Sequence, residues 1–203
     1  MDKKHIPNIL SFARIVIAPI FFIFLISDSL ILQQISLFLF IIASLTDSAD
    51  GYIARKYRTV SALGKFIDPF ADKLLTAAAF IAFVMMGIAP LWMVIIILIR
   101  DFGTTLMRLV WKKEFITSTT AKIKTTLQMT FISAILGLLF IRDLRISNWL
   151  YNSINTFIYS DIVYFLLLIL TIITVWTLVE YIFALRGKKI FSKKYVLYEN
   201  IRI

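Results

Sequence analysis

Long apolar runs alternate with short polar segments along the chain, and the apolar runs predict helices. A helix needs roughly 17–25 predominantly apolar residues to cross a membrane, and the runs approach or reach this length. The second run is expected to continue as a helix through residues 47–55, where polar side chains begin. The pattern predicts an all-α protein with six transmembrane helices, at residues 9–26, 30–45, 64–86, 91–110, 125–141 and 162–185.

The composition supports a location in a membrane. The chain has 203 residues, of which 60% are hydrophobic, and its mean hydropathy is +0.88. A soluble domain of this size would not carry that apolar load. We therefore expect a multi-pass protein of the cell (inner or plasma) membrane, with one domain over residues 1–203. Cysteine is absent, which excludes disulfides and thiolate metal sites.

The excess of basic residues predicts the orientation in the membrane. The formal net charge is +10, which in a membrane protein favours cytoplasmic loops, anionic lipid and phosphorylated substrates over nucleic acid. If six helices cross the membrane, the turns at 27–29 and 87–90 contain no Lys or Arg, and the 142–161 loop on the same side has Arg142 and Arg145 only. Both termini are therefore expected in the cytoplasm. The basic segments on that side are residues 3–4, 55–58, 112–124 and 186–194.

Three further features relate to the membrane surface. Residues 142–161 form a predicted loop whose aromatic residues are typical of the interface. The basic tail at 186–203 is amphipathic enough to lie on anionic lipid. Arg14, inside the first helix, could extend to the cytoplasmic interface or face the polar pocket that the acidic residues further along the chain are expected to form, and the sequence leaves both possibilities open.

Four aspartates stand at helical spacing between residues 47 and 72. Asp47 and Asp50 are three residues apart, and Asp68 and Asp72 are four apart, so each pair shares one face of a helix. Carboxylates near a bilayer need partners. Two such pairs on neighbouring helices would form an oxygen-rich pocket for a hard divalent cation. The alternative, a charged cytoplasmic loop between two helices, does not explain four acids at this spacing.

The same segment resembles the signature of the CDP-alcohol phosphotransferase family, Asp-x2-Asp-Gly-x2-Ala-Arg-x8-Gly-x3-Asp-x3-Asp. No position of the signature is missing, and every spacer has the required length. Eight fixed residues over a 26-residue span make a chance match improbable. The matching residues are Asp47, Asp50, Gly51, Ala54, Arg55, Gly64, Asp68 and Asp72.

The resemblance implies a role for most of these residues. Gly51, Arg55 and Gly64 would hold the cytidine and its diphosphate. Asp72 would act both as a metal ligand and as the general base, although spacing alone does not show which acid is the base. Mg²⁺ or Mn²⁺ would be bound by Asp47, Asp50, Asp68 and Asp72.

The resemblance also implies the substrate, a CDP-linked lipid that is usually CDP-diacylglycerol. The acceptor hydroxyl would attack the phosphate that bears the diacylglycerol, and CMP would leave. The physical chemistry agrees, because a metal ion neutralises the oxygens of a phosphoanhydride and the apolar surround offers a place for acyl chains. A homodimer is a further expectation from the family.

Cationic residues further along the chain indicate the acceptor. Arg100 and Asp101 lie at the centre of a predicted helix and point to different faces, so each is expected to have a partner on another helix. An active-site role and a role in helix packing are equally open for these intramembrane charges. A cationic pocket for a second phosphate could be formed by Arg100, Arg108, Lys122 and Lys124.

The region around these cations resembles the phosphatidylglycerophosphate synthases, a branch of the family that uses glycerol 3-phosphate. A looser pattern from Pro7 to Pro19 also resembles the N-terminal segment of these synthases. Two departures are visible: Ala121 stands where those enzymes usually have Gly, and the connection after Arg108 is short. A cardiolipin synthase of the same family, with phosphatidylglycerol as acceptor, therefore remains the alternative.

Two other classes of function are weaker alternatives. A divalent-cation channel or transporter needs polar residues through the full depth of the membrane. Here the acids cluster at one end of the predicted helices, and residues 77–86 are almost entirely apolar. An inactive homologue that serves only as a scaffold is disfavoured by the complete aspartate motif.

Overall fold

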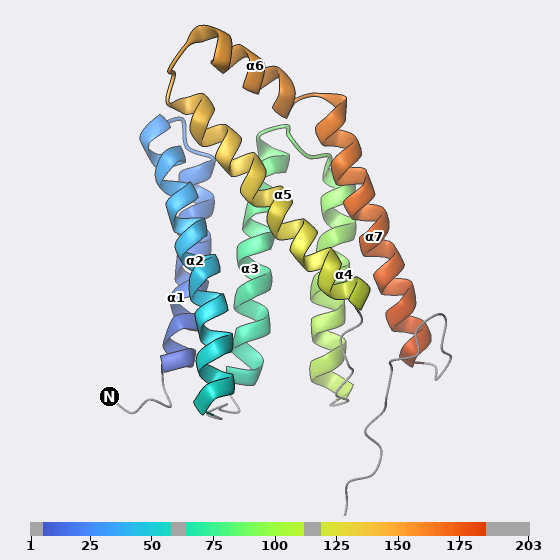
Figure 1. The fold of residues 1–203 in the computed structure, drawn as a ribbon. Coiled ribbons are helices and arrows are strands. Elements are labelled where there is room, and N and C mark those ends of the chain that lie inside the picture. Colours follow the sequence, from blue (N-terminus) through green and yellow to red (C-terminus); the bar gives the residue numbers. More distant parts are fainter. Residues whose placement is uncertain (1–5, 58–63, 112–118, 186–203) are drawn as a thin grey trace, which may run out of the picture.

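The structure is a computed structural model that describes the backbone of residues 6–57, 64–111 and 119–185 and the side chains of 11–46, 70–107 and 119–183. Within these ranges every element is a helix, and there are seven of them (Figure 1). They are α1 (Ile6–Leu25), α2 (Leu30–Tyr57), α3 (Gly64–Met85), α4 (Leu91–Trp111), α5 (Thr119–Asp143), α6 (Asn148–Ile158) and α7 (Asp161–Leu185).

The predicted all-α architecture is confirmed for the described residues, and five of the six expected helices start and end within a few residues of the prediction. The second helix continues through residues 47–55 as expected, because α2 ends only at Tyr57. The prediction was wrong for the start of α5, which begins at Thr119 rather than at residue 125. Lys122 and Lys124 therefore lie on a helix and not in a connecting loop.

The predicted loop at 142–161 contains the additional helix α6. Ser147 caps this helix, since its side chain accepts a hydrogen bond from the backbone N–H of Leu150. Leu150, Ile154 and Ile158 recur every four residues, and the last two are buried. The short amphipathic helix lies across one end of the bundle, between α5 and α7 (Figure 1). Its existence was missed because the sequence pattern here is short and mixed.

The helices pack in two groups, which contact each other where α4 packs against α3 and which α5 also connects. α1 packs closely against both α2 and α3, while α4 packs against α3 and α7. α5 crosses the bundle obliquely and contacts α2, α3 and α7 (Figure 1). Aromatic rings pack at the interface between α3 and α5, where Phe80 stacks on Phe131 with ring centroids 6.3 Å apart. This packing buries apolar side chains between the helices.

The distribution of side chains is typical of a membrane protein. Large apolar residues face outward along the helices, for example Ile31, Ile99 and Phe165. Charged residues are buried inside, a placement that is unusual in soluble proteins unless the charges are paired. In the described part of the chain, 119–143 and 148–183 are long and apolar enough to cross a membrane, and 11–25 and 30–46 are shorter apolar helices. Among the described side chains, the buried charged residues are Arg14, Arg100, Asp101, Lys124 and Asp143.

One end of the bundle carries the aspartate motif, and the opposite end carries α6. α2 ends, and α3 begins, at the end of the bundle opposite α6 (Figure 1). α4 and α7 also end there. At the α6 end, Arg142 pairs with Asp143, with Nε 2.7 Å from Oδ1, and a terminal nitrogen of Arg142 donates to Oε1 of Gln33. These contacts hold the end of α5 against the start of α2.

Candidate active site

The fold brings the two acid pairs of the aspartate motif to the same end of the bundle. Asp47, Asp50, Gly51 and Arg55 are on the last turns of α2, and Gly64 and Asp68 are on the first turns of α3. α2 and α3 are neighbours in the chain and run in opposite directions (Figure 1). The side chains of these six residues lie outside the described side chains, so their predicted roles stay predictions.

Asp72 is the one acid of the motif whose side chain the structure describes. It lies on α3 and is partly buried, and its Oδ2 is 3.2 Å from Nζ of Lys73. The hydroxyl of Thr76 donates to the backbone carbonyl of Lys73 one turn earlier. Lys73 was not predicted to belong to the site, although its place next to Asp72 is visible in the sequence.

The donor set of the motif fits a hard divalent cation. Asp72 offers a carboxylate whose side chain is 22% exposed and therefore accessible to a ligand. The other three acids stand on the helix turns that meet at this end. Carboxylate oxygens are the ligands preferred by Mg²⁺ and Mn²⁺. Among the described side chains, no group of three or more metal-binding residues is present, since three of the four acids fall outside them.

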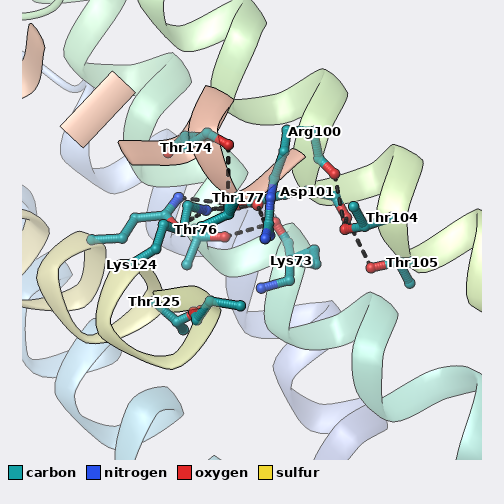
Figure 2. A network of polar contacts seen from close by, with 12 residues as sticks. Lys73, Thr76, Arg100, Asp101, Thr104, Thr105, Lys124, Thr125, Thr174 and Thr177 are labelled. Atoms are coloured by element: carbon teal, nitrogen blue, oxygen red, sulfur yellow. Dashed lines mark hydrogen bonds and ion pairs between the residues drawn. The ribbon is translucent and has the colours of Figure 1, made fainter. Parts of the chain in front are cut away.

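A buried polar network on α4 and α5 lies next to this end of α3 (Figure 2). The ammonium of Lys124 lies 2.6 Å from Oδ1 and 2.7 Å from Oδ2 of Asp101. Lys124 also donates to Oε1 of Gln128, whose amide nitrogen donates in turn to Oδ2 of Asp101 at 3.2 Å. Arg100 joins the same carboxylate, with Nη1 3.1 Å from Oδ1.

Long side chains bridge a space between α4 and α5. Within the described helices, α4 and α5 do not pack directly on each other, whereas α7 packs against both. Lys124 and Gln128 extend from α5 to reach Asp101 on α4. Figure 2 draws buried Thr174 and Thr177 of α7 in the same polar region. The interior of the bundle is therefore polar where these helices meet.

The structure divides the four cations that were predicted to bind a second phosphate. Arg100 and Lys124 meet at Asp101, and both are buried. Lys122 is exposed on the first turns of α5. It precedes Lys124 by two residues, a separation of about 200° around the helix, so the two lysines point to nearly opposite faces. Arg108 is on α4, and its side chain is outside the described ones. The role of all four in binding a phosphate stays a prediction.

The expected partners of the intramembrane charges are found in part. Asp101 has the predicted partner on another helix, Lys124 of α5. The described ion pair of Arg100 is instead with Asp101, its neighbour on α4. Gln128 was not predicted as a member of the network. Its position four residues after Lys124, on the same helix face, was the signal that could have found it.

Arg14 faces the interior of the bundle. Its relative exposure is 1%, and it is among the largest fully buried side chains. A side chain that extended to the membrane surface would keep its guanidinium in water. The burial therefore contradicts the interfacial alternative for Arg14, and its orientation toward the aspartate pocket stays a prediction.

Comparisons with known proteins agree with the motif. Residues 4–185 match the family described as CDP-alcohol phosphatidyltransferase. The chain is 41% identical over 147 residues to a CDP-diacylglycerol--glycerol-3-phosphate 3-phosphatidyltransferase of Bacillus subtilis, an alignment that covers 65% of this chain and 76% of the relative.

Two other relatives carry the same name. The one from Rickettsia typhi is 35% identical over 136 residues, covering 66% of this chain and 76% of the relative. The one from Haemophilus influenzae is 29% identical over 194 residues, covering 91% and 95%. The relative from Haemophilus influenzae therefore aligns along nearly the whole chain.

Proposed function

Because this chain belongs to the CDP-alcohol phosphatidyltransferase family, we propose that it transfers the phosphatidyl group of CDP-diacylglycerol to glycerol 3-phosphate. The products are CMP and phosphatidylglycerophosphate, and the enzyme is a transferase of phospholipid biosynthesis. The observation that carries the proposal is the similarity to relatives named for this reaction, together with the complete aspartate motif.

The proposed reaction is a displacement at phosphorus. A hydroxyl oxygen of the acceptor forms a bond to the phosphate that bears the diacylglycerol, and the bond from that phosphorus to the bridging pyrophosphate oxygen breaks. CMP leaves with the electron pair. The hydroxyl must lose its proton as it attacks, and Asp72 is the carboxylate proposed to take it. Its partial exposure and its place in the N-terminal half of α3, next to the other acids of the motif in the chain, support this role.

Metal binding is assigned to the two acid pairs. Asp47 and Asp50 on α2 and Asp68 and Asp72 on α3 would hold Mg²⁺ or Mn²⁺. When bound, a divalent cation neutralises phosphate oxygens and stabilises the charge that develops on the leaving group. An ion held between the two acid pairs would offset the repulsion between these carboxylates and the anionic phosphoanhydride. Gly51, Arg55 and Gly64 would hold the CDP moiety.

The acceptor phosphate is assigned to the cations of α4 and α5. Arg100, Arg108, Lys122 and Lys124 stand on these two helices. Arg100 and Lys124 lie near α3, which carries Asp72 (Figure 2). A phosphorylated acceptor held by them would present its hydroxyl toward the base. The names of the relatives favour glycerol 3-phosphate over phosphatidylglycerol, the acceptor of a cardiolipin synthase.

The proposed topology has six membrane-crossing helices and both termini in the cytoplasm, with residues 1–203 as one domain in the cell membrane. The basic connections adjoin the helix ends that lie at the motif end of the bundle (Figure 1). By the positive-inside rule this end faces the cytoplasm, where the soluble acceptor is found. α6 would then lie along the opposite surface. A homodimer is proposed from the family resemblance.

The test is incubation of the purified protein with CDP-diacylglycerol and separate candidate acceptors. CMP release and the lipid product are measured with glycerol 3-phosphate, phosphatidylglycerol or no acceptor. Release that depends on glycerol 3-phosphate and yields phosphatidylglycerophosphate supports the proposal. Consumption of phosphatidylglycerol alone would establish the cardiolipin synthase alternative instead.

A further inference from the structure

Lys124 has no ammonium hydrogen left for a ligand in this structure. An ammonium group has three donors, and three oxygen atoms accept from it: both carboxylate oxygens of Asp101 and Oε1 of Gln128. The side chain is wholly buried, with a relative exposure of 0%. To bind a phosphate directly, Lys124 would have to give up one of these contacts.

Gln128 connects both members of the ion pair. Its Oε1 accepts from Lys124, and its Nε2 donates to Oδ2 of Asp101 at 3.2 Å. A side-chain amide provides an acceptor and a donor on one rigid group, so it can serve a cation and an anion at the same time. Gln128 is itself buried. The three side chains therefore fix one another.

Arg100 differs from Lys124 because its hydrogen-bonding capacity is largely unused. Guanidinium has five N–H donors, and the described contact of Arg100 is a single bond from Nη1 to Oδ1 of Asp101. Its Nε is buried and has no partner among the described residues. The side chain of Arg100 is buried, with a relative exposure of 9%. A buried donor without a partner is costly, and an anion bound here would satisfy it.

The carboxylate of Asp101 connects Arg100 to Lys124. Its Oδ1 accepts from both Lys124 and Arg100. Two cations and one carboxylate leave the cluster with a net charge of +1, so it retains attraction for an anion. The carboxylate orients the guanidinium of Arg100, while Lys124 and Gln128 hold the carboxylate from across the space between α4 and α5.

We infer that Asp101, Lys124 and Gln128 are positioning residues that hold Arg100 in place for the phosphate of the acceptor. The inference rests on the proposed function and changes one of its assignments, because Lys124 supports the phosphate site without contacting the phosphate. Arg100 is the contact in this cluster.

The two possible roles of Lys124 predict opposite effects of removing the charge of Asp101. If Lys124 binds the phosphate, Asp101 competes with the acceptor, and Asp101→Asn frees the ammonium and lowers the KM for glycerol 3-phosphate. If Asp101 positions Arg100, the same substitution releases the guanidinium and raises that KM. A charge-assisted hydrogen bond corresponds to roughly ten-fold or more in affinity, so we expect an increase of about that size.

The experiment compares full-length wild type, Asp101→Asn, Gln128→Met and a control, Ser36→Ala, in detergent. Ser36 is buried on α2 and donates to the backbone carbonyl of Gln33, away from the network. The KM values for glycerol 3-phosphate and for CDP-diacylglycerol, kcat and Tm are measured for each protein. Gln128→Met keeps the size of the side chain and removes both of its hydrogen bonds, so it tests the network if Asp101→Asn does not fold.

The expected result is a higher KM for glycerol 3-phosphate in both network variants, with the KM for CDP-diacylglycerol unchanged and Ser36→Ala like wild type. A purely structural role would lower Tm and the amount of active enzyme without separating the two KM values. A lowered or unchanged KM for glycerol 3-phosphate in folded variants overturns the positioning role alone. A wild type that does not use glycerol 3-phosphate overturns the proposed function and this inference together.

Discussion

Lys124 and Asp101 are 23 residues apart in the chain, yet Nζ of Lys124 lies 2.6 Å from Oδ1 of Asp101. The pair joins α5 to α4, two helices that do not pack directly on each other within the described residues. Both side chains are almost fully buried. A buried ion pair is stable only when its geometry is good and its remaining hydrogen bonds are satisfied, and here Gln128 satisfies both partners.

Lys124→Met is expected to destabilise the protein, because it leaves the carboxylate of Asp101 with fewer partners in a buried site. Breaking one side of a buried pair costs about 3–5 kcal/mol, and the remaining contact with Arg100 places the expected loss near the lower end of that range. The double variant Lys124→Met/Asp101→Leu should recover part of the loss, since it removes both charges. Thermal unfolding in detergent measures both, and a double variant less stable than Lys124→Met would contradict the prediction.

Asp72→Asn is expected to remove turnover while leaving the binding of CDP-diacylglycerol largely intact. An amide can still coordinate or hydrogen-bond, but it cannot accept the proton of the acceptor hydroxyl. Loss of a general base typically reduces the rate by roughly 10²–10⁴. CMP release and CDP-diacylglycerol binding are measured side by side. Asp28→Asn, at an exposed position in the turn between α1 and α2, is the matched control. Near wild-type turnover in Asp72→Asn would place the base elsewhere.

Removal of divalent cations is expected to abolish activity, because the motif supplies only hard oxygen ligands. The purified enzyme is treated with a chelator, and Mg²⁺, Mn²⁺, Ca²⁺ and Zn²⁺ are then restored one at a time. Mg²⁺ or Mn²⁺ should restore CMP release. Full activity in the presence of the chelator would rule out the metal site at the two acid pairs.

Arg100→Lys is expected to raise the KM for glycerol 3-phosphate with little change in that for CDP-diacylglycerol. Guanidinium binds phosphate through two parallel hydrogen bonds, and lysine cannot reproduce that geometry. The loss of one charge-assisted contact is worth roughly 1.5–3 kcal/mol, or about ten- to a hundred-fold. Arg108→Lys should act in the same direction. Arg145→Lys, near the start of α6 and exposed, serves as the control. Equal changes in both KM values would argue against a specific acceptor contact.

Ser147→Ala is expected to lower stability by about 1 kcal/mol, because it removes the hydrogen bond from the side-chain oxygen to the N–H of Leu150 at the start of α6. The KM values should stay as in wild type, since α6 lies at the end of the bundle opposite the motif (Figure 1). Ser147→Asp, which can also cap a helix, should keep the stability of the wild type. A change in KM for glycerol 3-phosphate would show that the two ends are coupled.

The sequence by itself determined most of the helices and the motif. Long apolar runs define most of the helix boundaries, since a helix that crosses a membrane satisfies its own backbone hydrogen bonds and needs little from its neighbours. The continuation of α2 through Asp47–Arg55 followed from the helical spacing of the acids. Family membership followed from fixed residues at fixed intervals, which require no knowledge of packing.

Only the tertiary structure decided which polar groups meet. Arg100, Lys122 and Lys124 were equivalent as cations in the sequence, yet one of the two lysines is exposed and the other is buried against Asp101. Long side chains can reach a partner on their own helix or on another, and the choice depends on which helices lie across the shared space. The start of α5 and the existence of α6 were missed for the same reason: short polar or mixed segments become helical when packing supports them.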